Sequence, residues 1–472
     1  MSNTTGSGAP LWHGRFSASP AEALMAYTQS IGFDQRLWRD DIAGSIAHVR
    51  GLGHSKILSA EETESIVIAL QQVACEFDDE TFVIEPSDED IHTAIERRVT
   101  QIAGDTGAKL HTGRSRNDQC ATALRLWSKR ELRVVAERVL TLCDVLVARA
   151  DEAGWGDDGV YLPGYTHVQR AQPVLLAHHL LAHAWAFMRD VDRLSQCIER
   201  LDESPLGAGA LAGSSLPLDP DFVARELGFQ RRFANSLDAV ADRDYVAEAL
   251  FDLALIGVHL SRIGEEWVLW TSEEFGFAHL DDRYATGSSM MPQKKNADIA
   301  ELARGKSGRL IGNLAGLLAT LKGLPLSYNR DLQEDKEPLF DSVDQVSLGL
   351  LALAGMIATA TFHPINMAAA ADQQSLGATD LAEWLVSRGT PFRHAHAMVG
   401  ALVAQSISGE VSLHDLVLAD TAFGAEAAAL IAPGIPVLRR SSPGGGGPRA
   451  AKEQRTRFDR EISLLRTRLG SS

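Results

Sequence analysis

Three polar motifs contain the residues of this chain whose types and spacing could do chemistry. They are His111-Thr-Gly-Arg-Ser-Arg-Asn-Asp118, Pro163-Gly-Tyr-Thr-His-Val-Gln169 and Gly287-Ser-Ser-Met-Met-Pro-Gln-Lys-Lys-Asn296, and each precedes a predicted long helix. A helix N-terminus presents free N–H groups and the positive end of the helix dipole, and the arginines and lysines of the motifs add positive charge. The motifs therefore predict a site for a small ligand that carries carboxylates.

Each of these side chains also has a purely structural interpretation. Polar residues cap many helices, the doublet Lys294-Lys295 can be a solvated charge pair, and His167 can be an ordinary exposed histidine. The recurrence of such motifs at three helix starts is what favours a functional site. His179 and His183 share a helical face at metal-ligand spacing, but the sequence shows no His-Glu-x-x-His pattern and no evident third ligand. We therefore interpret both histidines as structural.

Long helices are the elements that must position the motifs. Asn117–Ala153 and Val174–Glu203 contain no glycine or proline, and apolar residues in the first recur mostly every three or four positions. Pro173 suits the first position of the second helix, Ser236 is a candidate cap of the third, and sustained strand alternation is absent from the sequence. The pattern predicts an all-α chain with five long helices, over Asn117–Ala153, Val174–Glu203, Leu237–Trp270, Ala297–Leu321 and Asp335–Phe362.

The fourth predicted helix has glycines on one face, at Gly305, Gly308, Gly312 and Gly316. They would weaken an isolated helix, so we expect another helix to pack closely against them. A helix of thirty residues is about 45 Å long, and compactly joined helices run antiparallel. The first two motifs would then lie at opposite ends of one bundle. If they form one site, a second subunit must contribute, which predicts a homo-oligomer with shared sites.

Composition excludes several classes of protein. The 472 residues are 45% apolar and 23% charged, as in soluble globular proteins, and the formal net charge of −17 makes binding to nucleic acid unfavourable. The longest apolar stretch, Leu348–Phe362, is shorter than a membrane span, and residues 1–10 lack the features of a signal peptide. Four cysteines without paired spacing fit a reducing cytoplasm. We expect a cytoplasmic protein that binds neither membranes nor nucleic acid.

Two glycine-rich segments carry no prediction of catalysis. Ser441–Pro448 is a low-complexity run that we interpret as a flexible connection. Gly207–Gly213 superficially resembles a dinucleotide-binding loop, but the strand before it and the helix after it are missing. A different short pattern, Ser59-Ala-Glu-Glu62, predicts a capping box at the start of a helix.

The three motifs resemble those of the fumarase/aspartase superfamily, whose mobile loop reads Gly-Ser-Ser-x-x-Pro-x-Lys-x-Asn. Within it the chain is most similar to the argininosuccinate lyase family, through His111 to Gln119 and through Tyr328-Asn-Arg-Asp-Leu-Gln-Glu-Asp-Lys336. The resemblance is nearly full length and also includes Arg15-Phe16, Ser30–Asp34 and Asp88–His92. It implies three domains, over residues 1–116, 117–363 and 364–472. It also implies a central five-helix bundle that assembles into a homotetramer, with three subunits contributing to each active site.

The resemblance also implies an activity, namely the reversible β-elimination of argininosuccinate to L-arginine and fumarate in arginine biosynthesis or the urea cycle, with no metal or organic cofactor. The residues that it implies as catalytic are His167, Ser288, Lys294, Asn296 and Glu301. The residues that it implies as substrate contacts are Ser30, Arg116, Asn117, Thr166, Tyr328, Gln333 and Lys336.

The chemistry of such an elimination needs these types of side chain. Removing a proton beside a carboxylate creates a dianionic aci-carboxylate, which Lys294 and Asn296 are suited to stabilise. The departing guanidino nitrogen needs a proton, which His167 could supply when a carboxylate such as Glu301 orients it. We favour Ser288 as the base, and the sequence leaves the reverse assignment open, with His167 as proton acceptor. The glycine and serines of the loop predict a lid that closes after binding.

Two positions depart from the family pattern, and two other functions remain open. Ala297 stands where the family usually has proline, which removes a preset first helical residue, and His13 stands where glycine is usual. A related lyase acting on adenylosuccinate, fumarate or aspartate would share the bundle and the loop. A soluble structural protein like the lens crystallins would share the fold. The Lys294-Lys295 doublet and the Tyr328–Lys336 segment weigh against a related lyase, and the retained catalytic positions favour an enzyme.

Overall fold

The computed structural model describes residues 21–409 and 411–471, so the predictions that fall on His13, Arg15 and Phe16 lie outside the described residues. The described chain is mostly helical, which confirms the all-α prediction. It forms two compact units, each assembled from three segments. The first unit contains the described residues up to Val135 together with Leu194–Ala254 and Leu310–Asp344, and the second contains the remaining described residues. The predicted division into three domains remains a prediction.

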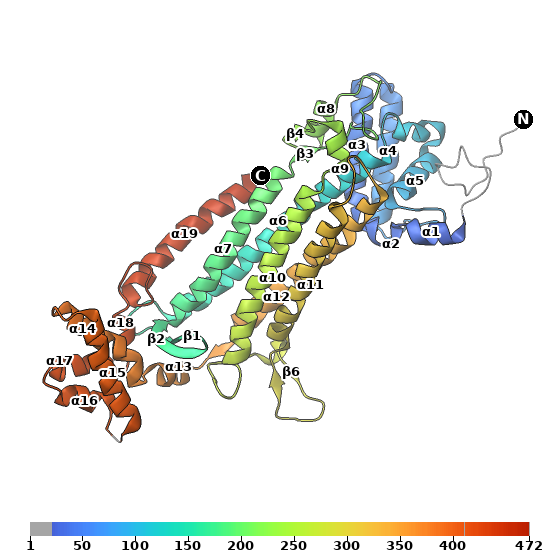
Figure 1. Cartoon of the computed structure of the whole chain (residues 1–472). Coiled ribbons are helices and arrows are strands. Elements are labelled where there is room, and N and C mark those ends of the chain that lie inside the picture. The colour runs from blue at the N-terminus through green and yellow to red at the C-terminus, as the bar shows by residue number, and fades with distance from the viewer. Residues whose placement is uncertain (1–20, 410, 472) are drawn as a thin grey trace, which may run out of the picture. The chain divides into compact units, whose positions relative to one another are not determined.

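Five helices of 24 to 38 residues have segments in both units (Figure 1). They are α6 (Arg116–Ala153), α7 (Leu176–Arg200), α10 (Asp244–Trp270), α11 (Asp298–Leu321) and α12 (Lys336–Thr359). The shorter helices of the first unit are α1 (Glu22–Thr28), α2 (Ile31–Asp34), α3 (Trp38–His54), α4 (Ala60–Asp78), α5 (Ile91–Gly107), α8 (Pro220–Glu226) and α9 (Ser236–Ala241). The C-terminal helices of the second unit are α13 (Pro364–Ala371), α14 (Ala378–Ser387), α15 (Phe392–Ser408), α16 (Leu413–Ala419), α17 (Gly424–Ala428), α18 (Ile435–Leu438) and α19 (Pro448–Ser471).

Eight short strands form four two-stranded ladders in the described chain. Three ladders are antiparallel, and the pair β3 with β4 is parallel. The paired strands are β1 (Tyr161–Thr166) with β2 (Gln169–Leu175), β3 (Glu203–Ser204) with β4 (Arg231–Arg232), β5 (Ala278–His279) with β8 (Thr361–Phe362), and β6 (Thr286–Gly287) with β7 (Lys295–Asn296).

The predicted helix over Val174–Glu203 was wrong at both ends, because it ends at Arg200 and Glu203 belongs to strand β3. Pro173 and Val174 belong to strand β2, where Pro173 lies opposite Pro163 of β1, and the helix begins at Leu176. Proline lacks the N–H group that an inner strand position donates, so it argues against a strand. A hairpin with two facing prolines could therefore not be predicted from the sequence.

The predicted helix over Leu237–Trp270 is two helices, α9 and α10. Asn235, not Ser236, caps α9, because its side-chain oxygen accepts hydrogen bonds from the backbone N–H groups of Leu237 and Asp238. The chain leaves the helical conformation at Asp242. The next residue, Arg243, is buried and donates to Asp335 across 2.5 Å. A tertiary ion pair therefore accompanies the break, where local sequence showed no helix-breaking residue.

The ends of the other predicted helices shift by one to three residues. Helix α6 begins at Arg116, and α11 begins at Asp298 and not at Ala297. Helix α12 ends at Thr359, and Thr361–Phe362 pairs as β8 instead of continuing the helix.

Helices α3, α4 and α5 pack against one another and form part of the core of the first unit. Leu52, Ile66, Leu70 and Ile95 from these helices are at most 1% exposed. The predicted capping box of α4 is confirmed, with Ser59 accepting from the Glu62 backbone N–H and Glu62 accepting from the Ser59 backbone N–H. Capping of this kind fixes where the helix starts.

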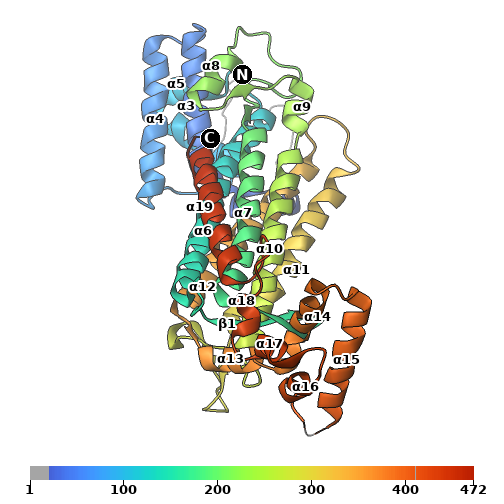
Figure 2. The same cartoon turned by 90° about the vertical axis from the view of Figure 1, so that its left-hand side faces the viewer.

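The long helices contact their neighbours in each unit separately. In the second unit, His259 of α10 pairs with Asp190 of α7 at 2.6 Å, and Lys306 of α11 donates to Gln345 of α12. In the first unit, Asn313 of α11 donates to Ser342 of α12 at 3.0 Å. Figure 2 shows α7, α10 and α11 in a second view.

Among the described residues, the segment Arg330–Thr359, which contains α12, is long and apolar enough to pass for a membrane span. However, 44% of its most apolar stretch is buried inside the fold.

The C-terminal half of the glycine-rich run before α19 is packed within the second unit, so the interpretation as a flexible connection does not hold for that half. Gly446 and Gly447 are buried, and the carbonyl of Gly446 accepts from the backbone N–H of Leu175 at 3.0 Å. A Cβ atom at Gly446 would lie 2.6 Å from a methyl group of Val174. Glycine is needed there because the backbone of the run lies directly on strand β2.

His48 gives the first unit a predicted sensitivity to acid. Its imidazole is buried in α3 and donates through Nε2 to the carbonyl of Thr112 at 2.9 Å. Burial and the charge of Arg114 lower the pKa of His48 to about 3. Between that value and the pKa of about 6.5 of an unfolded histidine, the unfolded chain binds the additional proton. Stability must therefore fall as the pH falls through this window, by up to about 1.4 kcal/mol per pH unit.

We expect His48→Gln to reduce this loss, because glutamine can donate to the Thr112 carbonyl and does not titrate. The measurement is the midpoint of thermal unfolding at pH 7 and pH 5 for both proteins. The drop should be smaller in the variant, and equal drops would contradict the assignment.

Candidate active site

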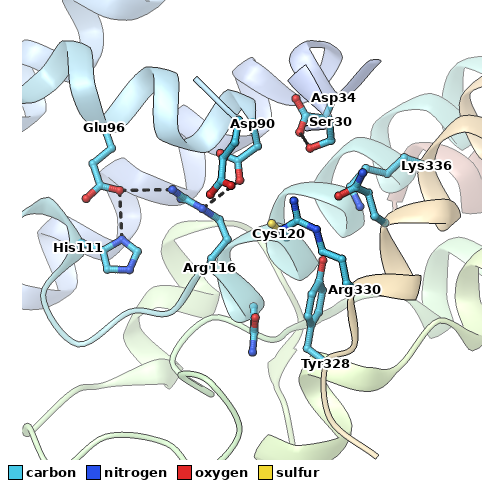
Figure 3. Close-up of a pocket in the computed structure, with 13 residues that line it drawn as sticks. Ser30, Asp34, Asp90, Glu96, His111, Arg116, Cys120, Tyr328, Arg330 and Lys336 are labelled. Atoms are coloured by element: carbon cyan, nitrogen blue, oxygen red, sulfur yellow. Dashed lines mark hydrogen bonds and ion pairs between the residues drawn. The ribbon is translucent and has the colours of Figure 1, made fainter. Parts of the chain in front are cut away.

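A cavity of about 510 Å³ in the first unit collects six of the seven predicted substrate contacts (Figure 3). Ser30 lies just before α2, Arg116 and Asn117 open α6, and Tyr328 precedes the short 3-10 helix η5 (Arg330–Asp335). The six predicted contacts that line the cavity are Ser30, Arg116, Asn117, Tyr328, Gln333 and Lys336. The seventh, Thr166, belongs to strand β1 of the second unit.

The first motif is held in place by its own aspartate. Asp118 accepts through Oδ1 from the Ser115 backbone N–H at 2.9 Å. Its Oδ2 accepts from the backbone N–H groups of Gly207 and Gly209, at 3.1 and 2.8 Å. The glycine-rich segment thus serves as a support for the start of α6, in agreement with the exclusion of a dinucleotide-binding loop.

One wall of the cavity is acidic and orients an arginine. Arg116 forms ion pairs with Asp90 at 3.2 Å and with Glu96 at 3.6 Å, and Glu96 also faces His111 at 3.3 Å (Figure 3). Burial opposes the charge of Arg116, but Asp90 and Glu96 outweigh it and raise the pKa of the guanidinium. Arg116 therefore remains a fixed cation with acids on one side.

The opposite wall contains a buried lysine. Lys336 donates to Asp335 at 2.9 Å, and Arg243 donates to the other oxygen of the same carboxylate. Burial opposes the charge of Lys336, but the Asp335 carboxylate prevails and raises the pKa of Lys336. Burial raises the pKa of Tyr328 to about 12, so its hydroxyl is protonated and can donate a hydrogen bond at neutral pH.

The cavity therefore combines acidic groups with cationic groups and hydroxyl donors. Such a mixture can bind a ligand that carries both a guanidinium and carboxylates, because each charge of the ligand finds an opposite charge in the wall. The observed side chains fit the predicted class of ligand, an acidic small molecule, and add complementarity for a cationic group.

Seven residues that line this cavity were not among the predicted contacts, namely Asp34, Glu89, Asp90, Glu96, His111, Cys120 and Arg330. Asp34 accepts from the Ser30 hydroxyl at 2.6 Å and from the Ile91 backbone N–H at 3.0 Å, so it anchors a predicted contact. Cys120 lies four residues after Arg116 on α6, and helical spacing from that residue was the available signal.

The second motif forms the tip of the hairpin β1–β2. Thr166 pairs with Gln169, and the two residues between them, His167 and Val168, have φ angles of 55° and 58°. A two-residue turn with both φ values positive normally contains Asn-Gly, because other residues are strained there. The turn exposes the His167 side chain at its tip.

The third motif is a loop closed by the strands β6 and β7. The Ser288 hydroxyl accepts from the backbone N–H groups of Met290 and Met291, at 3.2 and 3.0 Å. Lys295 is engaged by the Leu280 carbonyl and by Asp282. Lys294 is exposed, and among the described residues it has no ion-pair partner. Of the two lysines, Lys294 is the one available to a ligand.

The base of this loop is anchored despite the alanine at position 297. Ala297 is buried, and its carbonyl accepts from the Glu301 backbone N–H at 3.0 Å. Asn296 and Asp298 both contact the Thr286 hydroxyl, at 3.5 and 2.6 Å. These bonds tie the two ends of the loop together without a proline.

The five predicted catalytic residues all belong to the second unit. Glu301 is exposed on the first turn of α11. Within the described part of a single chain, no hydrogen bond joins His167 to Glu301 or to Ser288. The pairing of His167 with Glu301 therefore remains a prediction.

Comparisons with known proteins agree with the fold and the motifs. Residues 14–312 match the lyase family, and residues 375–433 match the argininosuccinate lyase C-terminal family. The argininosuccinate lyase of Frankia casuarinae is 51% identical over 449 residues, which are 94% of this chain and 96% of that protein. The argininosuccinate lyase of Renibacterium salmoninarum is 49% identical and covers 99% of both chains.

Solved structures show the same fold. An EDDS lyase in complex with formate has a TM-score of 0.81 at 28% identity, covering 95% of this chain and 90% of that chain. A class II fumarase from Schistosoma mansoni has a TM-score of 0.74 at 16% identity, covering 88% and 94%. The helical fold and the family matches thus define a lyase of the fumarase/aspartase superfamily, as predicted. Within that superfamily, the chain belongs to the argininosuccinate lyase family.

Proposed function

We propose that the protein cleaves argininosuccinate to L-arginine and fumarate by a reversible β-elimination. The observation that carries this proposal is the cavity of the first unit, where six predicted substrate contacts lie among acids and cations. Argininosuccinate carries carboxylates at both ends and a guanidino group in the middle, which matches this distribution of charge. Curated relatives named argininosuccinate lyase, at about 50% identity over nearly the whole chain, support the same activity.

Each catalytic side chain has one task in the proposed reaction. Ser288 removes the proton beside the succinyl carboxylate, and Lys294 and Asn296 stabilise the aci-carboxylate that results. His167, oriented by Glu301, gives a proton to the departing guanidino nitrogen. Thr166 and the six residues of the cavity hold the substrate. These proton transfers and charge interactions lie within the chemistry of the side chains themselves, so the proposal includes no cofactor.

We further propose that the active enzyme is a cytoplasmic homotetramer with shared active sites. Three large apolar side chains of α11 are exposed in the single chain, namely Leu302, Ile311 and Leu318. A Cβ atom added at any of the four glycines of α11 would meet nothing within 4 Å. A helix with an exposed apolar and glycine-rich face gains stability when another helix covers it. The row of glycines is therefore available to a neighbouring subunit.

Gly312→Leu tests this assembly. Nothing in the single chain obstructs the new side chain, so we expect the chain to fold and the oligomer to dissociate into smaller species. The measurement is the molar mass by light scattering after size-exclusion chromatography. Gly400→Leu is the matched control, because Gly400 is also helical, exposed and free of neighbours within 4 Å. A tetramer in both variants, or a wild-type monomer with full activity, would contradict the proposal.

The activity itself is tested by incubating the purified protein with argininosuccinate and measuring fumarate and arginine together. Equal amounts of the two products are the expected result. A folded oligomer that releases neither product would indicate a structural protein or a related lyase. Assays with adenylosuccinate, fumarate and aspartate would then separate these alternatives.

A further inference from the structure

Two histidines of α7 and one glutamate of α10 meet in the second unit. His179 and His183 lie one helical turn apart, and the Nε2 atoms of both approach Oε2 of Glu266, at 2.6 and 2.7 Å. The three ligand atoms all lie within 4.8 Å of one another. We interpreted these histidines as structural partly because the sequence showed no third ligand. Glu266 is a possible third ligand, so that reason no longer holds.

The surroundings hold the three side chains in place while leaving an opening. The exposed fractions of the side chains are 22% for His179, 16% for His183 and 37% for Glu266. The His179 ring packs against Trp270, with 5.0 Å between the ring centroids. The three groups thus lie on two rigid helices, and solvent can reach them.

The Glu266 carboxylate supplies a negative charge between the two imidazoles, and this charge attracts a divalent cation. Arg262 lies one turn before Glu266 on α10 and is exposed, so solvent screens its charge.

We propose that His179, His183 and Glu266 form a binding site for one divalent transition-metal ion per chain, with Zn²⁺ as the best fit. Two imidazoles and a carboxylate are a ligand set that Zn²⁺ accepts, with water in the fourth position. Ligand atoms around tetrahedral Zn²⁺ lie about 3.3 Å apart, within the range that the three atoms span. Mg²⁺ and Ca²⁺ prefer oxygen ligands and are disfavoured by the two nitrogens.

The ion takes the place of hydrogen bonds that the three side chains now make. In the metal-free pair of contacts, each Nε2–H donates to the Glu266 carboxylate. The metal binds the tautomer of each imidazole that carries its proton on Nδ1, so that the lone pair of Nε2 faces the ion. The ion then links α7 to α10 and stabilises only the folded chain, so the unfolding temperature rises with the concentration of metal.

The test uses the full-length protein, freed of any purification tag and treated with a chelator. Titration with Zn²⁺ in a calorimeter should give one site per chain. His183→Gln and Glu266→Gln should each weaken the site by at least about tenfold, because each removes one of three ligands. Co²⁺ should give visible absorption bands in the wild type that disappear in His179→Gln/His183→Gln. Circular dichroism establishes that each variant is folded.

His259→Gln is the matched control. His259 contacts Asp190 at 2.6 Å between the same two helices, as a single imidazole and carboxylate without a second histidine. We expect this variant to bind Zn²⁺ like the wild type. Absence of stoichiometric Zn²⁺ binding by the wild type, or unchanged binding by the double variant, would overturn the proposal.

Discussion

Ser288→Ala is expected to bind argininosuccinate and to lose the chemical step. A positioned general base commonly contributes about 10²- to 10⁴-fold in rate, so we expect kcat to fall within that range. A serine hydroxyl is a weak acid, and the structure offers one means of stabilising its ionised form. The backbone N–H groups of Met290 and Met291 both donate to the Ser288 oxygen, and hydrogen bonds to an anion favour the anion.

The measurement combines two quantities. Substrate affinity is obtained by calorimetry with argininosuccinate, and turnover is obtained from the release of fumarate. Ser289→Ala is the matched control, since it removes a neighbouring hydroxyl from the same loop and should keep most of the activity. Turnover near that of the wild type in Ser288→Ala would refute Ser288 as the base and leave His167 as the candidate.

The long helices could be predicted from the sequence because their signals are local. Asn117–Ala153 contains neither glycine nor proline, and it forms α6 with an end that agrees to the residue. The hairpin β1–β2 could not be predicted in the same way. Pro173 suggested a helix start, and the turn contains His167 and Val168 where the usual turn residues would be Asn and Gly.

The candidate site also contains residues that local sequence patterns predict and residues that they do not. The substrate contacts lie in motifs with recognisable residue patterns, and six of them line one cavity. From the cluster of His179, His183 and Glu266, the sequence indicated only the two histidines. Glu266 could not be predicted as their partner, because it is 83 residues from His183 in sequence. Only the packing of α7 against α10 makes them neighbours. Sequence motifs predict which residues take part in a site. Partners that lie far away in the sequence, such as Glu266, become apparent only from tertiary contacts.

Arg243→Met is expected to destabilise the first unit strongly. The Arg243 and Asp335 side chains are at most 1% exposed, and Asp335 also accepts from Lys336 at 2.9 Å. Removing one partner of a buried ion pair usually costs about 3 to 5 kcal/mol, because the remaining charge is left without compensation. We expect a loss near 3 kcal/mol, because Lys336 still neutralises part of the Asp335 charge.

The same substitution should also impair substrate binding, because Lys336 lines the cavity and shares Asp335 with Arg243. Denaturant unfolding followed by circular dichroism measures the stability, and the KM for argininosuccinate measures binding. Arg200→Met is the matched control. Arg200 pairs with Glu248 in the same unit, but its side chain is 54% exposed, so its loss should cost less than about 1 kcal/mol. If the two variants were equally stable, the ion pair between Arg243 and Asp335 would not be what joins η5 to the segment between α9 and α10.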